Sequence, residues 1–138
     1  MSPNVVLVDI DGTVATRGER GPYEWGRVSE DSPNYAVIKV VLALQSAEYE
    51  IVFITGRSEE CRNDTKIWLS KNVSVPQKLF MREKRDFRPD EIIKKELVTR
   101  NFPDTSLILL VIDDRTKVVN MWRHELGLTC LQVGEGNF

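Results

Sequence analysis

Two aspartates two positions apart, Asp9 and Asp11, follow a short apolar run near the start of the chain. If the extended conformation of that run persists, both carboxylates point the same way. Gly12 comes next and permits a tight turn. Two carboxylates at the end of an apolar strand are electrostatically unfavourable without a cation or a shared proton. The spacing therefore indicates a site that binds a cation or shares a proton; the alternative is two aspartates that cap a turn.

A second acidic pair, Asp113 and Asp114, follows the most apolar run of the chain, LILLVI. Adjacent acids at this position are unexpected unless they meet a hard cation, and Mg²⁺ takes oxygen ligands and keeps several waters. The pair therefore predicts a magnesium site. The alternative is a pair of acids at a helix N-terminus, where the helix dipole favours negative charge.

Two further motifs carry groups that suit a phosphate. Thr55, Gly56 and Arg57 are predicted to end a strand and open a helix, where a hydroxyl and free backbone N–H groups can bind an anion. Asp90 and Lys94 are four residues apart on a predicted helix and so share one face. Taken alone, the first motif could be turn chemistry and the second an exposed ion pair.

The elements that must position these residues alternate between strand and helix patterns. Helices are expected after a cap and first-turn proline at Ser32–Pro33, after Ser58, from Pro89, and over 116–126. The alternation predicts an α/β fold of three layers, a mostly parallel five-stranded sheet with helices on both faces. The predicted strands are 5–9, 51–55, 79–81, 107–113 and 129–133, and the apolar positions of the first helix are Val37, Val40, Val41 and Leu44.

All four motifs fall at the ends of predicted strands or helices that meet at one edge of the sheet. In open parallel sheets the ligand crevice lies beyond the carboxyl ends of the strands. The glycine-rich segment 14–31 is predicted to be a loop or small hairpin, a flap over the end of the first strand. Neither 14–31 nor 70–78 has room for a large cap domain, so we expect a crevice open enough to admit a polymer end.

Composition narrows the class of protein. The chain has 138 residues, 41% of them hydrophobic and 29% charged, which fits a single globular domain over residues 1–138. No apolar run is long enough to span a membrane, and no basic region precedes the first apolar run as it would in a signal peptide. Cys61 and Cys130 are too few for a disulfide framework. We therefore expect a cytoplasmic protein that does not act at a membrane.

The motifs in this order resemble those of the haloacid dehalogenase-like (HAD) phosphohydrolases. DIDGT resembles their first motif, TGR their second, Lys94 their third and DD their fourth. Longer segments resemble the phosphatase domain of bacteriophage-type polynucleotide kinase/phosphatases, over nearly the whole chain from Val5. The sequence has no glycine-rich P-loop, so a 5′-kinase activity is not expected. The segments are RGPYE (20–24), TGR (55–57), RPDEIIKKE (88–96), IDDRTKVVNMWR (112–123) and LQVGEGNF (131–138).

The resemblance implies a catalytic scheme. Asp9 is the nucleophile that forms an aspartyl-phosphate, and Asp11 is the general acid and then the general base. Mg²⁺ is held by Asp9, by the backbone carbonyl of Asp11 and by Asp113 or Asp114. The residues implied to bind phosphate or substrate are Thr55, Gly56 and Arg57 of the TGR motif, Lys94 with Asp90 orienting it, and Arg20.

The substrate implied is a 3′-phosphate at a DNA or RNA end. A separate kinase or ligase would act beside the phosphatase. The location implied is a cytoplasm, which could be that of a phage host. Two other functions stay open, a phosphatase of small phosphomonoesters and a non-catalytic module that binds nucleic-acid ends. Tyr23, Trp25 and Phe87 could stack on bases. His124 is expected to be structural. A path for the nucleic-acid backbone could be formed by Arg82, Lys84, Arg85 and Arg88. The alternative is that these four residues form an ordinary solvated surface.

Overall fold

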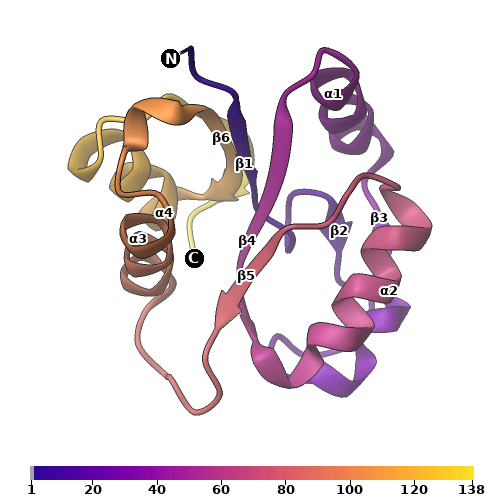
Figure 1. The fold of residues 1–138 in the computed structure, drawn as a ribbon. Coiled ribbons are helices and arrows are strands. Elements are labelled where there is room, and N and C mark those ends of the chain that lie inside the picture. The colour runs from indigo at the N-terminus through magenta and orange to yellow at the C-terminus, as the bar shows by residue number, and fades with distance from the viewer. Residues whose placement is uncertain (1) are drawn as a thin grey trace.

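A five-stranded parallel sheet forms the centre of the protein, whose computed structural model describes residues 2–138 (Figure 1). The strands lie in the order β5-β4-β1-β6-β7, and every neighbouring pair is parallel. All five predicted strands are confirmed. They are β1 (Val5–Val8), β4 (Glu50–Ser58), β5 (Leu79–Arg82), β6 (Ile108–Arg115) and β7 (Cys130–Gly136).

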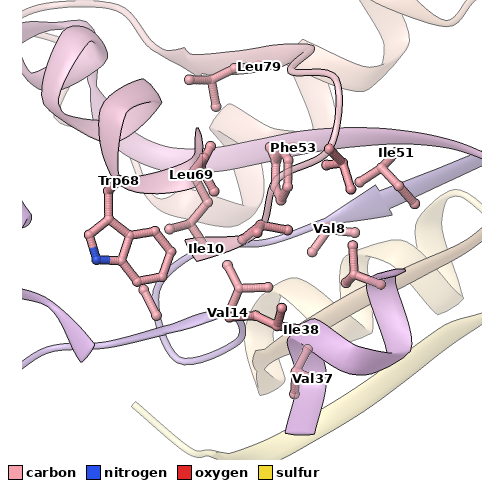
Figure 2. Close-up of a cluster of buried hydrophobic side chains, with 14 of the residues drawn as sticks. Val8, Ile10, Val14, Val37, Ile38, Ile51, Phe53, Trp68, Leu69 and Leu79 are labelled. Atoms are coloured by element: carbon pink, nitrogen blue, oxygen red, sulfur yellow. The ribbon is translucent and has the colours of Figure 1, made fainter. Parts of the chain in front are cut away.

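The alternation of side chains along β1 explains why the sheet needs cover on both faces. Val6 and Val8 belong to one buried cluster, shown in part in Figure 2, while Val5 and Leu7 belong to a second cluster on the opposite face. A fully buried aliphatic side chain contributes about 1.5–3 kcal/mol relative to an exposed one. A strand with four such residues therefore requires helices on each side.

Helices cover both faces and complete three layers, as predicted (Figure 1). Helices α1 (Tyr35–Ser46) and α2 (Arg62–Asn72) pack on one face, and α3 (Asp90–Asn101) and α4 (Thr116–Asn120) on the other. A π-helical turn, η4 (Met121–Glu125), continues α4, so the helix predicted over 116–126 is present with a widened second half. Short 3₁₀ turns η2 (Glu59–Cys61) and η3 (Thr105–Leu107) precede α2 and β6.

The start of the first helix differs from the prediction. Ser32–Pro33 forms a short strand, β3, and α1 begins at Tyr35 after Asn34. Pairing with the flap hairpin takes the backbone of Ser32 and Pro33 out of the helical region, which a cap pattern alone cannot reveal. Val40 was expected on the buried face but is 47% exposed, and Ile38 is buried instead.

The segment 14–31 forms a hairpin over the end of β1. Strand β2 (Ala15–Thr16) pairs antiparallel with β3, and the 3₁₀ turn η1 (Trp25–Glu30) lies between them and packs against α2. The connection from α2 to β5 is confined to 73–78. We call 14–31 the flap. The edge of the sheet above β1 is thus bordered by a short flap, with no large cap in the described residues.

None of the helices within residues 2–138 is long and apolar enough to cross a membrane. Cys61 and Cys130 are both buried free thiols.

Candidate active site

Three carboxylates gather where β1 and β6 end. Asp9 follows β1, and its backbone N–H donates to the carbonyl of Ile112 at 2.9 Å, which locks the two strand ends side by side. Asp113 and Asp114 are the next residues of β6. One carboxylate oxygen from each of Asp9, Asp113 and Asp114 lies within 4.8 Å of the others. The structure therefore brings Asp9 of the first acidic pair to the second pair, Asp113 and Asp114, which lies about a hundred positions further along the chain.

Lys94 reaches this cluster from α3. Its ammonium donates to Asp9 Oδ1 at 2.7 Å and to Asp113 Oδ2 at 3.0 Å. Burial alone would lower the pKa of Lys94, but the carboxylates of Asp113 and Asp9 outweigh burial and raise that pKa above its usual range. Lys94 is therefore charged at neutral pH.

The charge balance of the cluster calls for a divalent cation. Three carboxylates face one ammonium, and burial together with the charge of Asp113 raises the pKa of Asp9 well above its usual range. Burial also raises the pKa of Asp114. Carboxylate oxygens are the ligands that Mg²⁺ prefers, and a charge of +2 would offset the excess of negative charge. The donor set formed by Asp9, Asp113 and Asp114 therefore fits Mg²⁺.

The side chain of Asp11 takes no part in this cluster, because two arginines hold it. Arg57 donates to both of its carboxylate oxygens, at 3.0 and 2.8 Å, and Arg20 from the flap donates at 3.0 Å. Burial opposes ionisation of Asp11, but the guanidinium of Arg57, supported by Arg20, lowers its pKa below the usual range. The predicted site residues Arg20 and Arg57 thus meet at Asp11.

Asp31 is a buried member of this network that the sequence analysis missed. Its side chain is fully buried, and its carboxylate accepts from Arg20 at 2.7 and 3.0 Å and from Arg57 at 2.6 Å. Asp31 therefore holds the two arginines that hold Asp11. Its carbonyl also accepts from the indole of Trp68 at 2.9 Å. Nothing in the local sequence distinguishes Asp31 from neighbouring surface acids such as Glu30.

The TGR motif lies on a strand and not at a helix N-terminus. Strand β4 continues through it to Ser58, with an irregularity between Thr55 and Ser58, and α2 begins later. Thr55 is buried, and its hydroxyl accepts from the backbone N–H of Arg57 at 3.1 Å. Thr55 and Gly56 both line the cleft that contains Asp9. The motif therefore does not form the expected anion site at the start of a helix, although Thr55 and Gly56 line the same cleft as Asp9.

Asp90 does not pair with Lys94 as its spacing suggested. Its carboxylate is bound by Arg82 and by Arg115, the latter at 2.9 Å. A side chain at Gly56 would collide with this carboxylate, since an added Cβ would overlap Asp90 Oδ1. Asp90 therefore acts on Lys94 only through its charge, which helps to raise the pKa of Lys94.

The basic cluster at 82–88 divides into two groups. Arg82 binds Asp90, and Arg88 binds Asp86 and Glu96. Arg85 lines the cleft, and Lys84 does not. Of the four residues expected to contact a nucleic-acid backbone, only Arg85 both lines the cleft and has no carboxylate partner within residues 2–138. Arg82 and Arg88 are engaged in ion pairs of the loop between β5 and α3.

His124 is exposed on the π-helical turn and is not among the residues that line the cleft. Tyr23, Trp25 and Phe87, the aromatic residues expected to stack on bases, all line it.

Comparison with known proteins identifies the family. The sequence pattern described as the polynucleotide kinase PNKP phosphatase domain matches residues 3–138. A protein of Autographa californica nuclear polyhedrosis virus, with the provisional name bifunctional polynucleotide kinase/RNA ligase, is 36% identical over 124 residues. That match covers 88% of this chain and 18% of the viral protein.

Two solved structures share the fold. One is a chain of the Pnkp1/Rnl/Hen1 RNA repair complex, with a TM-score of 0.93 and 35% identity over 99% of this chain and 44% of that chain. The other is a chain of a Pnkp1/Rnl/Hen1 complex, with a TM-score of 0.92, 35% identity and coverage of 99% and 48%. The chain thus spans less than half the length of these relatives. It belongs to the HAD-type phosphatase-domain family of polynucleotide kinase PNKP.

Proposed function

We propose that residues 1–138 form a single phosphatase domain, with 14–31 as its flap, that removes 3′-phosphates from DNA or RNA ends. The observation that carries the proposal is the position of Asp9, with Lys94 at 2.7 Å and the carboxylates of Asp113 and Asp114 beside it. These groups suit a nucleophile, a cation site and a charge that balances phosphate. Membership of a polynucleotide kinase phosphatase family supports the choice of substrate.

In the proposed reaction Asp9 attacks phosphorus, and the bond from phosphorus to the 3′-oxygen breaks as an aspartyl-phosphate forms. Covalent catalysis of this kind divides one difficult displacement into two easier ones. Lys94 and Thr55 bind the phosphoryl oxygens and balance the charge that develops on them. Water then attacks the aspartyl-phosphate, which releases inorganic phosphate and regenerates Asp9.

Asp11 carries the protons of the two steps. It protonates the leaving 3′-oxygen and then accepts a proton from the attacking water. Before substrate binds, Arg57 and Arg20 hold Asp11 in its ionised form. The side chains of both arginines are buried and neither lines the cleft, so Asp11 lies between them and a phosphate bound in the cleft. The negative charge of that phosphate raises the pKa of Asp11 by like-charge repulsion, and Asp11 then takes up a proton.

Magnesium would be held by Asp9, Asp114 or Asp113, and the backbone carbonyl of Asp11. When bound, it neutralises carboxylates that would otherwise repel a phosphate dianion. Asp114 has the freer carboxylate of the β6 pair. Asp113 Oδ1 accepts from the backbone N–H of Asp114 at 2.8 Å, and its Oδ2 accepts from Lys94 and from Trp122.

The cellular setting belongs to the same proposal. The buried free thiols of Cys61 and Cys130 suit a reducing cytoplasm. The names of the related proteins associate them with kinase and ligase activities and with RNA repair complexes. We propose that a kinase and a ligase, linked to this domain or separate, act on the same ends after the 3′-phosphate has been removed.

A panel of phosphorylated substrates tests the function. Turnover is measured with Mg²⁺ and with chelator on a 3′-phosphorylated oligonucleotide, the same oligonucleotide with a 5′-phosphate, and a mononucleotide, in DNA and RNA forms. The proposal expects a preference for the 3′-phosphorylated oligonucleotide that chelator abolishes. Equal turnover of the mononucleotide would indicate a phosphatase of small substrates. Absence of turnover across the panel would indicate a binding module.

A further inference from the structure

Trp122 is a buried tryptophan that the proposed reaction does not use. It is the largest of the fully buried side chains in the described residues, and it lies on the π-helical turn η4 that continues α4. Turns of this kind are rare and occur frequently at functional sites. The backbone N–H of Leu126 donates to the carbonyl of Met121 at 3.2 Å, and that of Leu128 donates to the carbonyl of Trp122 at 2.9 Å. The turn therefore holds the indole in one place.

The polar edge of this indole meets the carboxylate cluster. Its Nε1–H donates to Asp113 Oδ2 at 3.1 Å. A buried indole N–H usually has a hydrogen-bond partner, because an unpaired one destabilises the fold. A phenylalanine would fill most of the same space without that requirement. The property that distinguishes Trp122 from an apolar core residue is therefore its contact with Asp113.

Asp113 accepts hydrogen bonds from three different groups. Its Oδ2 accepts from the ammonium of Lys94 at 3.0 Å as well as from Trp122, and its Oδ1 accepts from the backbone N–H of Asp114 at 2.8 Å. An ionised carboxylate offers about four lone pairs to donors. A metal ion that bound Asp113 directly would therefore compete with donors that are already in place.

Asp114 is held much less tightly. Within residues 2–138 its carboxylate accepts from one group, the hydroxyl of Thr13, at 3.5 Å, which is at the outer limit for a hydrogen bond. Asp9 accepts from Lys94 at 2.7 Å and from Thr13 at 2.9 Å. Of the three carboxylates, Asp113 has the most donors and Asp114 is the most available to a cation.

The number of carboxylates that reach the ion decides which divalent cation the site prefers. Mg²⁺ requires octahedral geometry, keeps several waters and is usually bound through one or two carboxylates. Ca²⁺ takes about six to eight oxygen ligands in a more flexible arrangement. Asp9 and Asp114 alone suit the smaller ion, whereas a third carboxylate from Asp113 would add oxygen ligands and favour the larger one.

We propose that Trp122 is a positioning residue that withholds the carboxylate of Asp113 from the metal ion and so shifts the selectivity of the site toward Mg²⁺ and away from Ca²⁺. The inference rests on the cation site of the proposed function and assigns to it a residue that determines selectivity. Asp113 then places its negative charge beside the ion without a direct bond to it. Replacement of residues that hydrogen-bond to the groups around a metal often changes metal affinity by about 10–100-fold.

The variant Trp122→Phe tests the proposal, because it keeps an aromatic ring and removes the N–H. Isothermal titration measures the Kd of Mg²⁺ and the Kd of Ca²⁺ without any phosphate substrate. The ratio of the Kd for Ca²⁺ to the Kd for Mg²⁺ is expected to fall about tenfold. This factor corresponds to about 1.4 kcal/mol, close to the contribution of one hydrogen bond to a charged group.

Trp68→Phe is the matched control. Trp68 is also a buried tryptophan, and its indole N–H donates to the carbonyl of Asp31 at 2.9 Å, away from the carboxylate cluster. The control loses a buried hydrogen bond of the same kind and should leave the cation ratio unchanged. An unchanged ratio in Trp122→Phe, or an equal change in Trp68→Phe, overturns the proposal.

A double-mutant cycle tests whether Trp122 acts through Asp113. In an Asp113→Asn background Trp122→Phe should no longer change the cation ratio, because no carboxylate remains to be released. The same change in both backgrounds would show that Trp122 acts by another route and would overturn the proposal.

A measurement on wild type keeps the proposal testable even if Trp122→Phe does not fold. In ¹⁵N-labelled protein the indole N–H signal of Trp122 is identified by elimination with Trp25→Phe and Trp68→Phe. A hydrogen bond to a carboxylate holds this proton signal downfield, and it should remain downfield when Mg²⁺ saturates the site. An upfield shift to the position of a free indole would show that Asp113 leaves Trp122 for the ion, and would overturn the proposal.

This inference and the proposed function fail in different ways. Turnover of the 3′-phosphorylated oligonucleotide together with an unchanged cation ratio in Trp122→Phe would retain the phosphatase and reject the role of Trp122. A ratio that depends on Trp122, without turnover by wild type, would support that role and reject the phosphatase. Absence of Mg²⁺ binding to wild type would reject both.

Discussion

At the scale of single residues, the site depends on how each carboxylate is shared. Asp9 and Asp113 share the ammonium of Lys94, whereas Asp11 and Asp31 share the guanidinium groups of Arg20 and Arg57. Asp9 and Asp11 are therefore in different groups of charged residues, although they are only two positions apart in DIDGT. Asp9 belongs to the carboxylate cluster that fits a cation, and Asp11 belongs to the arginine network to which the proposed function assigns proton transfer.

We predict that Asp31→Asn reduces kcat/KM on the 3′-phosphorylated oligonucleotide by about 100-fold. The change keeps the size of the side chain but removes the charge that fixes Arg20 and Arg57, and a displacement of a catalytic group by about 1 Å can cost that much. Because a buried ion pair is broken, stability should fall by about 3–5 kcal/mol. Activity and urea unfolding are measured together, at a temperature where the variant is folded.

Asp104→Asn is the control for this prediction, because Asp104 caps a surface turn at η3. Asp31→Glu should recover part of the activity, since it restores the charge. Activity of Asp31→Asn equal to that of wild type would show that Asp11 is positioned without Asp31.

At the scale of elements, the way the ends of β6 and β7 pack together positions Asp113 and Asp114. Gly136 at the end of β7 lies against the backbone of β6, and a Cβ at Gly136 would overlap the carbonyl oxygen of Asp114. The glycine therefore allows β7 to press on the strand that carries Asp113 and Asp114. A flexible side chain could move aside, but a backbone atom of the central sheet cannot.

We predict that Gly136→Ala destabilises the fold by about 1–3 kcal/mol, the usual cost of overpacking. It should also weaken Mg²⁺ binding, because relief of the clash moves Asp114. Isothermal titration and thermal unfolding measure the two effects. Gly26→Ala is the control, since an added Cβ there meets nothing within 4 Å. Unchanged metal affinity in Gly136→Ala would show that the packing of β7 does not position Asp114.

Much of this element layout was predictable from the sequence. Apolar runs indicated all five strands, and the rule that ligands bind beyond the carboxyl ends of parallel strands predicted that Asp9 and Asp113 converge. The start of α1 and the end of β4 were not predictable, because they depend on pairing with β3 and on an irregular strand. Asp31 was missed because its two partners come from Arg20 on the flap and Arg57 on β4, which only the tertiary fold brings together.

At the scale of the whole molecule, the carboxylate cluster of Asp9, Asp113 and Asp114 opposes folding at neutral pH when no cation is bound. Burial and Asp113 raise the pKa of Asp9 above its ordinary 3.8. The folded protein therefore holds the Asp9 proton more tightly than the unfolded chain does. This contribution to stability is fully present below pH 3.8 and is lost as pH rises through the folded-state pKa. At neutral pH the metal-free protein is destabilised by its own carboxylates.

We predict that Asp9→Asn increases the free energy of unfolding of the metal-free protein at pH 7, by about 1.4 kcal/mol for each unit by which the pKa of Asp9 is raised. Mg²⁺ at 100 times its Kd should stabilise wild type by about 2.7 kcal/mol, and the variant by less. Thermal unfolding with Mg²⁺ and with chelator measures both. Glu48→Gln, an exposed acid far from the site, should follow wild type. A variant less stable than wild type without metal would contradict this account of the cluster.

The indole rings of the protein offer a practical consequence. Trp122 donates to Asp113 at 3.1 Å, Trp68 to the carbonyl of Asp31, and Trp25 supports Tyr23 at the cleft wall. These are the three tryptophans of the chain. Each therefore contacts a different part of the site, and intrinsic fluorescence, with one indole retained at a time, would report separately on the carboxylate cluster, the arginine network and the cleft wall without any attached dye.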